Sequence, residues 1–254
     1  MISEQGILKY LAEPMDVRVY DELSSTNKTA RELEPSLDGE ALIIARRQSG
    51  GRGRMGRSFF SPEGGLYMSL LLRPKMSAAE AVKLTSAAAV AVSCAIDEIA
   101  GVRCGIKWVN DVYLDGRKVC GILTEAQITD GALSFAVLGI GVNLVPPKCG
   151  FPEEIKNRAG SVFDRIEADE DDRLAAGIVN EFMRMYRNGA AEHLAEYRER
   201  SFLIGREVDV MRIADGECRP AVAVAIDDEC RLVVRYADGS AEALGSGDVS
   251  VRGL

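Results

Sequence analysis

The sequence predicts an α+β fold, with a mixed or antiparallel sheet and helices followed by a small C-terminal β-barrel. Three observations predict it. Short strand patterns stand beside a few long helical ones, turn signals separate consecutive strands, and five short alternating segments occupy roughly the last 50 residues. We therefore expect two domains, residues 1–204 and residues 205–254.

The first predicted elements are a helix and two strands. SSTNKTARELE, residues 24–34, opens with hydroxyl side chains that cap helices, and it predicts a helix that ends before Pro35. GEALIIARRQ predicts a buried strand over residues 41–45. GLYMSLLLRP, residues 65–74, predicts a second strand closed by its proline.

The middle of the chain predicts a helix packed on strands. The alanine-rich run over residues 77–100 predicts a long helix whose small side chains allow close packing on a sheet. Strand patterns follow over residues 102–109, 111–127 and 132–144, and the second of them turns back at an Asp-Gly pair, which is a hairpin signal.

Helical and then strand patterns complete the chain. Residues 169–189 and 190–201 have helical patterns, and acidic residues at the start of the first suit the helix dipole. The five predicted C-terminal strands are REVDVM, CRPAVAVAID, CRLVVRY, SAEAL and DVSVR.

Composition limits the class of protein. Lys and Arg total 31 against 39 Asp and Glu, a net charge of -8, so general attraction to nucleic acid or an anionic membrane is not expected. The six cysteines have no CxxC spacing, which favours a reduced intracellular protein. Without a signal peptide or an apolar run long enough to span a bilayer, we expect a cytoplasmic protein.

A glycine-arginine segment stands out from this acidic background. GGRGRMGRSFFSPEGG covers residues 50–65, and residues 41–62 contain five arginines and no acidic residue. Clustered guanidinium groups repel one another, so a polyanionic ligand best explains them. Glycine makes the loop flexible enough to fold over that ligand.

Other interpretations of the segment depend on the residues directly after it. It satisfies G-x-G-x-x-G, and it matches a P-loop pattern with Arg57 in place of lysine, but both motifs need a helix directly after the glycines. Here Phe59, Pro62 and two glycines lead into a strand, so both are disfavoured. A solvated basic turn stays open from the residues alone.

Several motifs in register resemble those of the biotin protein ligase family. They are GRGRMGR, KWVND (107–111), GRKVCGILTE (116–125) and GIGVNL (139–144), with SSTN (24–27), FPEEIKNRAGSVFD (151–164) and ALGSGDVSVR (243–252) beside them. The resemblance implies a class II aminoacyl-tRNA-synthetase-like catalytic domain and an SH3-like C-terminal barrel. It also implies that ATP activates biotin to biotinyl-5'-AMP. The biotin would then pass to a lysine of the biotin carboxyl carrier protein of acetyl-CoA carboxylase or of a related enzyme.

The chain departs from the family pattern at a few positions. Val109 stands where KWPND has proline, Met55 replaces a second adjacent arginine, and Phe59 replaces a tryptophan while keeping an aromatic face for adenine. Few residues precede SSTN, so the resemblance implies the catalytic-only type, which lacks the DNA-binding domain of members that repress transcription.

Forming an acyl adenylate brings two anions together, so cations are the main requirement. By resemblance, Arg52 and Arg54 lie at the carboxylate and phosphate, and Lys118 lies at the junction of biotin and AMP. The implied catalytic residues are Lys118, Arg54 and Lys107, the implied nucleotide contacts are Arg57, Phe59, Lys107, Asn110 and Asn143, and Asp111 is the implied Mg²⁺ ligand. From the residues alone, an exposed hairpin lysine beside Asp115 stays open as the less favoured alternative for Lys118.

The ureido ring of biotin needs donors and acceptors within an apolar pocket. The residues implied to bind biotin are Ser25, Thr26, Asn27, Gln48, Gly51, Arg52, Gly53, Arg54 and Lys118. SSTN also makes a good helix N-cap without any ligand, and both roles are compatible.

We expect the only tryptophan and the only histidine of the sequence to lie outside the site. Trp108, on a predicted strand, is expected in the core. His193 lies in a late helical pattern among glutamates and is expected at the surface, which argues against Ser-His-Asp catalysis.

Two other functions stay open. One is a lipoate or octanoate ligase of the same fold, which the GRGR segment disfavours. The other is a non-catalytic module that binds biotin or a nucleotide, which retention of the basic residues disfavours. No nucleic acid or membrane partner is expected, and the sequence is compatible with a homodimer.

Overall fold

A mixed sheet carries the larger part of the chain. The computed structural model describes residues 1–77, 80–129, 132–188, 191–212, 216–245 and 249–252. Its seven-stranded sheet has the order β1-β2-β3-β7-β6-β5-β4, with only β1 and β2 parallel among its described pairs. The strands are β1 (Asp16–Leu23), β2 (Ala41–Gln48), β3 (Gly65–Leu72), β4 (Gly105–Lys107), β5 (Asp111–Leu114), β6 (Arg117–Thr129) and β7 (Ala132–Asn143). The predicted mixed sheet is therefore confirmed.

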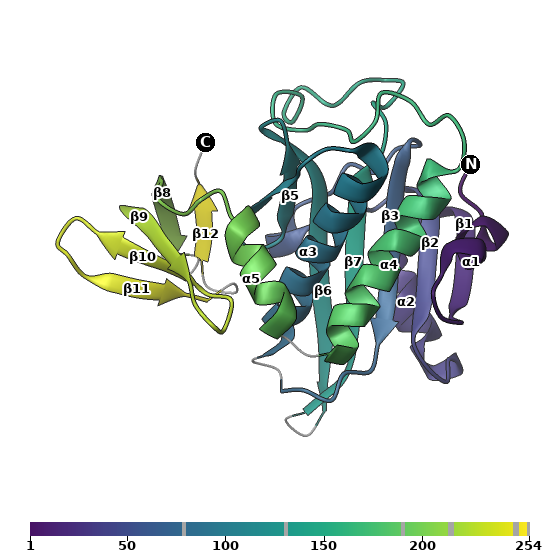
Figure 1. The fold of residues 1–254 in the computed structure, drawn as a ribbon, viewed down its shortest axis with the longest axis horizontal. Coiled ribbons are helices and arrows are strands. Elements are labelled where there is room, and N and C mark those ends of the chain that lie inside the picture. Colours follow the sequence, from purple (N-terminus) through teal and green to yellow (C-terminus); the bar gives the residue numbers. More distant parts are fainter. Residues whose placement is uncertain (78–79, 130–131, 189–190, 213–215, 246–248, 253–254) are drawn as a thin grey trace.

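Helices pack against both faces of this sheet. They are α1 (Glu4–Tyr10), α2 (Thr26–Leu33), α3 (Ala81–Ala100), α4 (Glu170–Asn188) and α5 (Ala191–Arg200), with short 3-10 turns η1 (Glu34–Ser36) and η2 (Arg54–Gly56). In Figure 1, α3 and α4 cross the near face of the sheet, and α2 lies behind β2 and β3. The long predicted helix is α3, and the predicted start over residues 78–79 lies outside the described residues.

Alternation along the strands explains why the two faces differ. On β3, Met68 and Leu70 belong to the large hydrophobic core that includes α3 and α4, whereas Leu71 belongs to a smaller cluster with Ala30 of α2. Because successive side chains of a strand point to opposite faces, Ser69 shares the α2 face with Leu71. The α3/α4 face is largely apolar, and the α2 face has room for polar and small residues.

The C-terminal residues form a second sheet, as the strand patterns predict. Its five antiparallel strands have the order β11-β10-β9-β8-β12. They are β8 (Glu207–Arg212), β9 (Cys218–Ile226), β10 (Leu232–Tyr236), β11 (Ala241–Leu244) and β12 (Val249–Arg252). This sheet lies beside α5 in Figure 1. The domain boundary between residues 204 and 205 stays a prediction.

The turn between β9 and β10 contacts the larger part of the chain. Trp108 Nε1 donates to the carbonyl oxygen of Cys230 at 2.9 Å, and Arg198 of α5 donates to the carbonyl oxygen of Ile226 at 2.8 Å. Both Trp108 and Cys230 are buried, so the C-terminal sheet reaches the segment that carries KWVND.

The expectation for His193 is wrong. The side chain is only 2% exposed, and its Nε2 lies 3.0 Å from Ser86 Oγ of α3. Burial lowers its pKa to about 4, so it is neutral at pH 7. The neighbouring glutamates suggest a surface helix, but α3 covers the side of α5 that carries His193.

The structure adds one finding on membranes. Among the described residues, no helix combines the length and apolar character that crossing a membrane requires.

Candidate functional site

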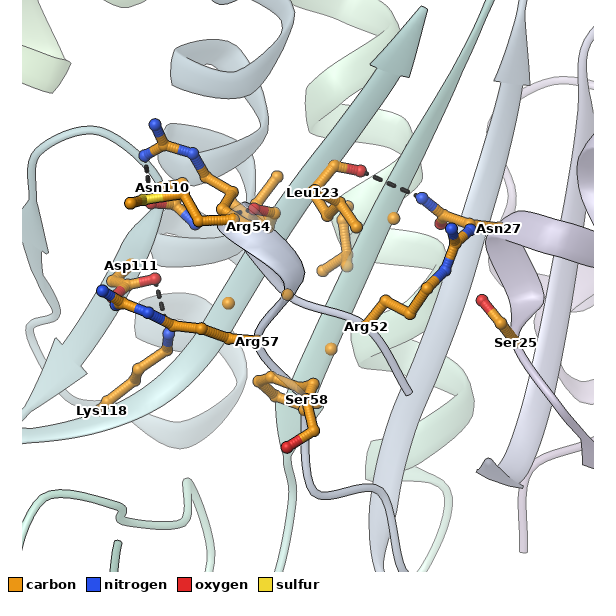
Figure 2. A pocket seen from close by; sticks show the side chains of 18 of the residues that line it. Ser25, Asn27, Arg52, Arg54, Arg57, Ser58, Asn110, Asp111, Lys118 and Leu123 are labelled. Carbon is orange, nitrogen blue, oxygen red and sulfur yellow. Dashed lines mark hydrogen bonds and ion pairs between the residues drawn. The ribbon is translucent and has the colours of Figure 1, made fainter. Parts of the chain in front are cut away.

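A single cavity brings together most of the predicted site residues. It has a volume of about 200 Å³ and lies between the glycine-arginine segment, the start of α2, and strands β6 and β7. Figure 2 shows Ser25, Asn27 and Arg52 on one side of this cavity and Arg54, Asn110, Asp111 and Lys118 on the other. We call the first side, with Thr26 and Gln48, the neutral end. We call the second, with Arg57 and Lys107, the cationic end.

Glycines on β6 and β7 open the floor of the cavity. A Cβ at Gly139 would lie 2.1 Å from Asn27 Oδ1, and one at Gly141 would lie 2.6 Å from the Phe59 ring. No side chain fits at those distances, so only glycine lets α2 and the arginine loop approach the sheet. Gly121 pairs with Gly141 across the β6-β7 ladder and lies under the same ring.

The start of α2 forms the neutral end. Ser25 is the N-cap, and its hydroxyl accepts from the Lys28 N–H at 3.5 Å. Gln48, at the end of β2, accepts from the Thr26 N–H at 2.8 Å through Oε1 and donates to Ser61 Oγ at 3.1 Å through Nε2. The helix start and the strand end are thus joined by side-chain hydrogen bonds.

A buried serine on β3 orients this end from below. Ser69 Oγ lies 2.7 Å from Asn27 Oδ1 and 2.8 Å from Thr26 Oγ1, and Ser69 is completely buried. The Asn27 amide donates to Leu123 O at 3.3 Å and to Glu125 Oε2 at 2.8 Å. Both atoms of the Asn27 amide are therefore engaged within the protein. This fits a side chain that shapes the pocket.

The arginine loop is folded on itself above the cavity. The Gly53 N–H donates to Arg57 O at 2.7 Å, and the Phe59 N–H donates to Gly51 O at 2.9 Å. Met55 has a positive φ of 58° at the centre of the loop. This tight turn sends the arginine side chains to different places, as Figure 2 shows for Arg52 and Arg54.

Each of these two arginines contacts a different part of the sheet. Arg52 Nη2 lies 2.9 Å from Glu125 Oε2 on β6, and Arg54 Nη1 donates to Asn110 Oδ1 at 3.1 Å, just before β5. Asn110 is itself fixed, since its Nδ2 donates to Ile122 O at 2.8 Å. The loop is thus connected to both ends of the cavity.

Lys118 and Asp111 form the centre of the cationic end. Lys118 Nζ lies 2.6 Å from Asp111 Oδ1, and it lies 6.0 Å from the centroid of the Phe59 ring. The Lys118 backbone is held by the segment after β7, because its N–H donates to Arg158 O at 2.7 Å and its carbonyl accepts from the Gly160 N–H at 2.9 Å. This contact fixes a lysine that the sequence alone could have left exposed.

Partial burial removes water from two basic side chains of the cationic end. Loss of water around the side chains lowers the pKa of Lys107 and of Arg54, although the nearby Asp111 carboxylate acts in the opposite direction on both. A cation that has lost hydration binds an anion more strongly than one in bulk water. These two groups therefore favour a ligand with negative charge.

Trp108 is both a core residue and part of the cavity wall. It is 6% exposed, as the core expectation requires, yet it lines the cavity. The peptide bond between Trp108 and Val109 is cis, and Val109 O accepts from Tyr197 OH at 3.0 Å. The KWVND segment is thus fixed by α5 and by the β9-β10 turn.

Two predicted site residues do not line the cavity. Gly51 packs under Phe59 O and Ser61 Oγ, where a Cβ would lie 2.4 Å from each. Asn143 Nδ2 donates to Gly160 O at 2.9 Å and so holds the segment that supports Lys118. Direct ligand contact by either residue stays a prediction. The remaining predicted residues line it: Ser25, Thr26, Asn27, Gln48, Arg52, Gly53, Arg54, Arg57, Phe59, Lys107, Asn110, Asp111 and Lys118.

Sequence reasoning missed Ser69 and Glu125 as parts of the site. Ser69 is a polar residue within the apolar run GLYMSLLL, and this interruption is a signal that could have found it. Glu125 closes the motif GRKVCGILTE, but nothing local indicates its partners.

A metal would have few protein ligands here. Among the described residues, no group of three or more His, Cys, Asp or Glu side chains could hold an ion. Asp111 is the carboxylate that lines the cavity. One carboxylate suits Mg²⁺ that arrives with nucleotide phosphates, rather than a resident metal in a protein cage.

Comparisons with known proteins show the family of this chain. The model of the biotin/lipoate A/B protein ligase family matches residues 19–143, and that of the biotin protein ligase C terminal domain matches residues 203–252. The bifunctional ligase/repressor BirA of Bacillus subtilis is 41% identical over 65% of this chain and 50% of its own length. The biotin--[acetyl-CoA-carboxylase] ligase of Mycobacterium tuberculosis is 32% identical over 84% of this chain and 79% of its own length.

A solved structure extends the likeness to the fold. Biotin protein ligase from Aquifex aeolicus, in complex with biotin and ATP, has a TM-score of 0.77 at 25% identity, over 93% of this chain and 98% of that one. The chain belongs to the biotin/lipoate A/B protein ligase family. It spans about half the length of the Bacillus relatives that it matches.

Proposed function

We propose that this protein is a biotin protein ligase, which forms biotinyl-5'-AMP from biotin and ATP and then transfers biotin to a lysine of a carrier protein. One observation carries the proposal. A hydrogen-bonded neutral end and a partly buried cationic end lie in one cavity, with Lys118 and Asp111 2.6 Å apart at the second. Such a cavity suits a ligand that is neutral at one end and anionic at the other.

The cationic end supports the first reaction. An oxygen of the biotin carboxylate forms a bond to the α-phosphorus of ATP, and the bond from that phosphorus to pyrophosphate breaks. Lys118, Arg54 and Lys107 would neutralise the two anions as they meet, while Arg57, Phe59 and Asn110 would hold the nucleotide. Preformed cations in a site with little water lower the barrier because they need not reorganise.

The neutral end supports selection of the acid. The ureido group of biotin has two N–H donors and one carbonyl acceptor, and Ser25, Thr26 and Gln48 supply hydroxyl and amide partners. Thr26 is already hydrogen-bonded to Gln48 and to Ser69, so binding costs little further ordering. Gly51 and Gly53 leave the arginine loop close to the bound acid.

Magnesium belongs to this proposal as part of the ATP substrate. Asp111 would share it with the phosphate oxygens, and the ion would shield the charge of the leaving pyrophosphate. Lys118 already neutralises Asp111, so the two residues would exchange partners when the nucleotide binds.

Transfer would complete the reaction. The carrier lysine attacks the carbonyl carbon of the mixed anhydride, AMP leaves, and the amine loses its proton. The folded arginine loop would keep water from the anhydride until the carrier arrives. We propose the biotin carboxyl carrier protein of acetyl-CoA carboxylase, or a related carrier, as the partner. The cytoplasmic location, the homodimer and the lack of a nucleic-acid partner stay predictions.

Pyrophosphate exchange tests the proposed function directly. The protein is incubated with ATP, Mg²⁺ and labelled pyrophosphate, with biotin, lipoate or octanoate as the acid and no carrier. We expect label to enter ATP only with biotin. Exchange with lipoate or octanoate in place of biotin would show a related ligase. Biotin binding without exchange would show a binding module.

A further inference from the structure

Glu125 lies between three elements that build the neutral end of the cavity. Its Oε2 accepts from Asn27 Nδ2 of α2 at 2.8 Å and lies 2.9 Å from Arg52 Nη2 of the arginine loop. Its Oε1 lies 3.4 Å from Arg31 Nη2. The carboxylate side chain is only 20% exposed, whereas Arg52 is 47% exposed. One acidic group therefore joins a fixed amide to a more exposed guanidinium.

The Glu125-Arg52 contact matters because most charged side chains that line the cavity are basic. Five basic side chains line it, namely Arg52, Arg54, Arg57, Lys107 and Lys118, while Asp111 is the acidic residue that lines it. Asp111 is paired with Lys118 at the cationic end. The backbone on both sides of Arg52 is hydrogen-bonded within the loop, but its long, partly exposed side chain could swing toward any strong anion. A phosphate group would be the strongest such anion.

The Glu125 carboxylate on β6 opposes movement of the Arg52 side chain toward another anion. A partly buried, charge-assisted contact is stronger than an ion pair in bulk water. Glu125 is held in turn by Asn27, whose other contacts to Ser69 and Leu123 fix its amide. The position of Arg52 is therefore set by the rigid part of the pocket.

We propose that Glu125 is a positioning residue that keeps the Arg52 guanidinium at the neutral end of the cavity, where it serves binding of the acid substrate. This inference rests on the proposed function, in which biotin occupies the neutral end. Glu125 separates the basic residues into two groups. Arg52 is balanced and assigned to the acid, and the other four basic residues stay at the cationic end, where the carboxylate of the acid meets ATP.

Substitution Glu125→Gln tests the proposal, because glutamine keeps the shape and removes the charge. Biotin affinity is measured by calorimetry without ATP, and both KM values are measured by pyrophosphate exchange. We expect the Kd and KM for biotin to rise about tenfold, the order expected for loss of a charge-assisted hydrogen bond. The KM for ATP should stay within about twofold of the native value, because the ATP-binding cations keep their places.

A matched control and a double-mutant cycle separate positioning from a general loss of stability. Glu34→Gln removes a carboxylate of similar exposure, 19%, that pairs with Arg73 away from the cavity, and it should leave biotin affinity unchanged. In an Arg52→Ala background, Glu125→Gln should add much less than tenfold, because the effects of coupled residues are not additive. Glu125→Asp, which keeps the charge, should restore most of the affinity.

The outcomes are distinct. Unchanged biotin affinity in Glu125→Gln overturns the inference, as does an equal effect in the Arg52→Ala background. A rise in the KM for ATP equal to that for biotin also overturns it. If Glu125→Gln does not fold, Arg52→Gln must give the same selective loss of biotin affinity, or the inference fails. A native protein that binds no biotin refutes the proposed function itself, and this inference with it.

Discussion

The neutral and cationic ends of the cavity are built in different ways. At the neutral end, side chains bond chiefly to one another, as when Ser69 Oγ reaches Asn27 Oδ1 at 2.7 Å. At the cationic end, partly buried basic side chains accumulate around the Lys118-Asp111 pair, and loss of hydration lowers the pKa of Lys107. The first arrangement has fixed shape, and the second holds charge that a ligand can neutralise.

This difference separates recognition from chemistry. A preformed hydrogen-bonded surface discriminates between neutral groups, because a wrong ligand leaves buried polar atoms without partners. A desolvated cluster of cations favours any anion, and it favours most the state in which negative charge concentrates. Changes at the neutral end should therefore alter biotin binding, and changes at the cationic end should alter adenylation.

The largest expected effect comes from Lys118→Ala. It removes a cation at the centre of the cationic end and leaves Asp111 without its partner, so adenylation should fall about 10²- to 10³-fold. Pyrophosphate exchange measures the rate, and calorimetry should find a much smaller loss of biotin binding. Lys156→Ala, which removes an exposed lysine paired with Glu153, should match the native rate. Equal rates in the two variants would contradict the role of Lys118.

A smaller effect is expected at the neutral end from Ser69→Ala. The change removes a buried hydroxyl that orients Thr26 and Asn27, so the KM for biotin should rise by roughly 5- to 30-fold, as for loss of a buried hydrogen bond. Ser93→Ala is the matched control, because Ser93 is equally buried but bonds only to Ala89 O in the described part of α3. A similar KM in both variants would show that Ser69 acts only on stability.

The smallest effect concerns pH at the cationic end. Desolvation lowers the pKa of Lys107 below its ordinary value of 10.5, so its charge is lost earlier as pH rises. The kcat/KM for ATP should accordingly fall at a lower pH than an ordinary lysine would give. Lys107→Arg should move this alkaline limb upward, since arginine stays protonated. An alkaline limb at the same pH in both proteins would exclude Lys107 as its source.

Local patterns were sufficient for the main elements of the fold. The helix start within SST (24–26), the strand beginning at Ala41 and the Asp115-Gly116 turn each depend on a few neighbouring residues, and each was predicted correctly. The alternating strands of the C-terminal sheet were found for the same reason.

Contacts between distant residues could not be predicted in that way. Ser69 and Asn27 are 42 residues apart, and Glu125 and Asn27 are 98 apart. Only the sheet order brings them together, because β3, β7 and β6 are neighbours. His193 was misplaced for a related reason, since its partner Ser86 lies 107 residues away. The motif resemblance supplied most of the cavity, but it did not indicate what holds its residues in place.

The most direct test of the two-ended site compares Ser69→Ala with Lys107→Met in one pyrophosphate exchange experiment, with biotin and MgATP varied independently. A site with two separate ends predicts a crossed result. Ser69→Ala should raise the KM for biotin alone, and Lys107→Met should raise the KM for ATP or lower kcat while the KM for biotin stays near the native value. If both variants changed both KM values in the same proportion, the cavity would act as one undivided site, which contradicts the separation of recognition from chemistry.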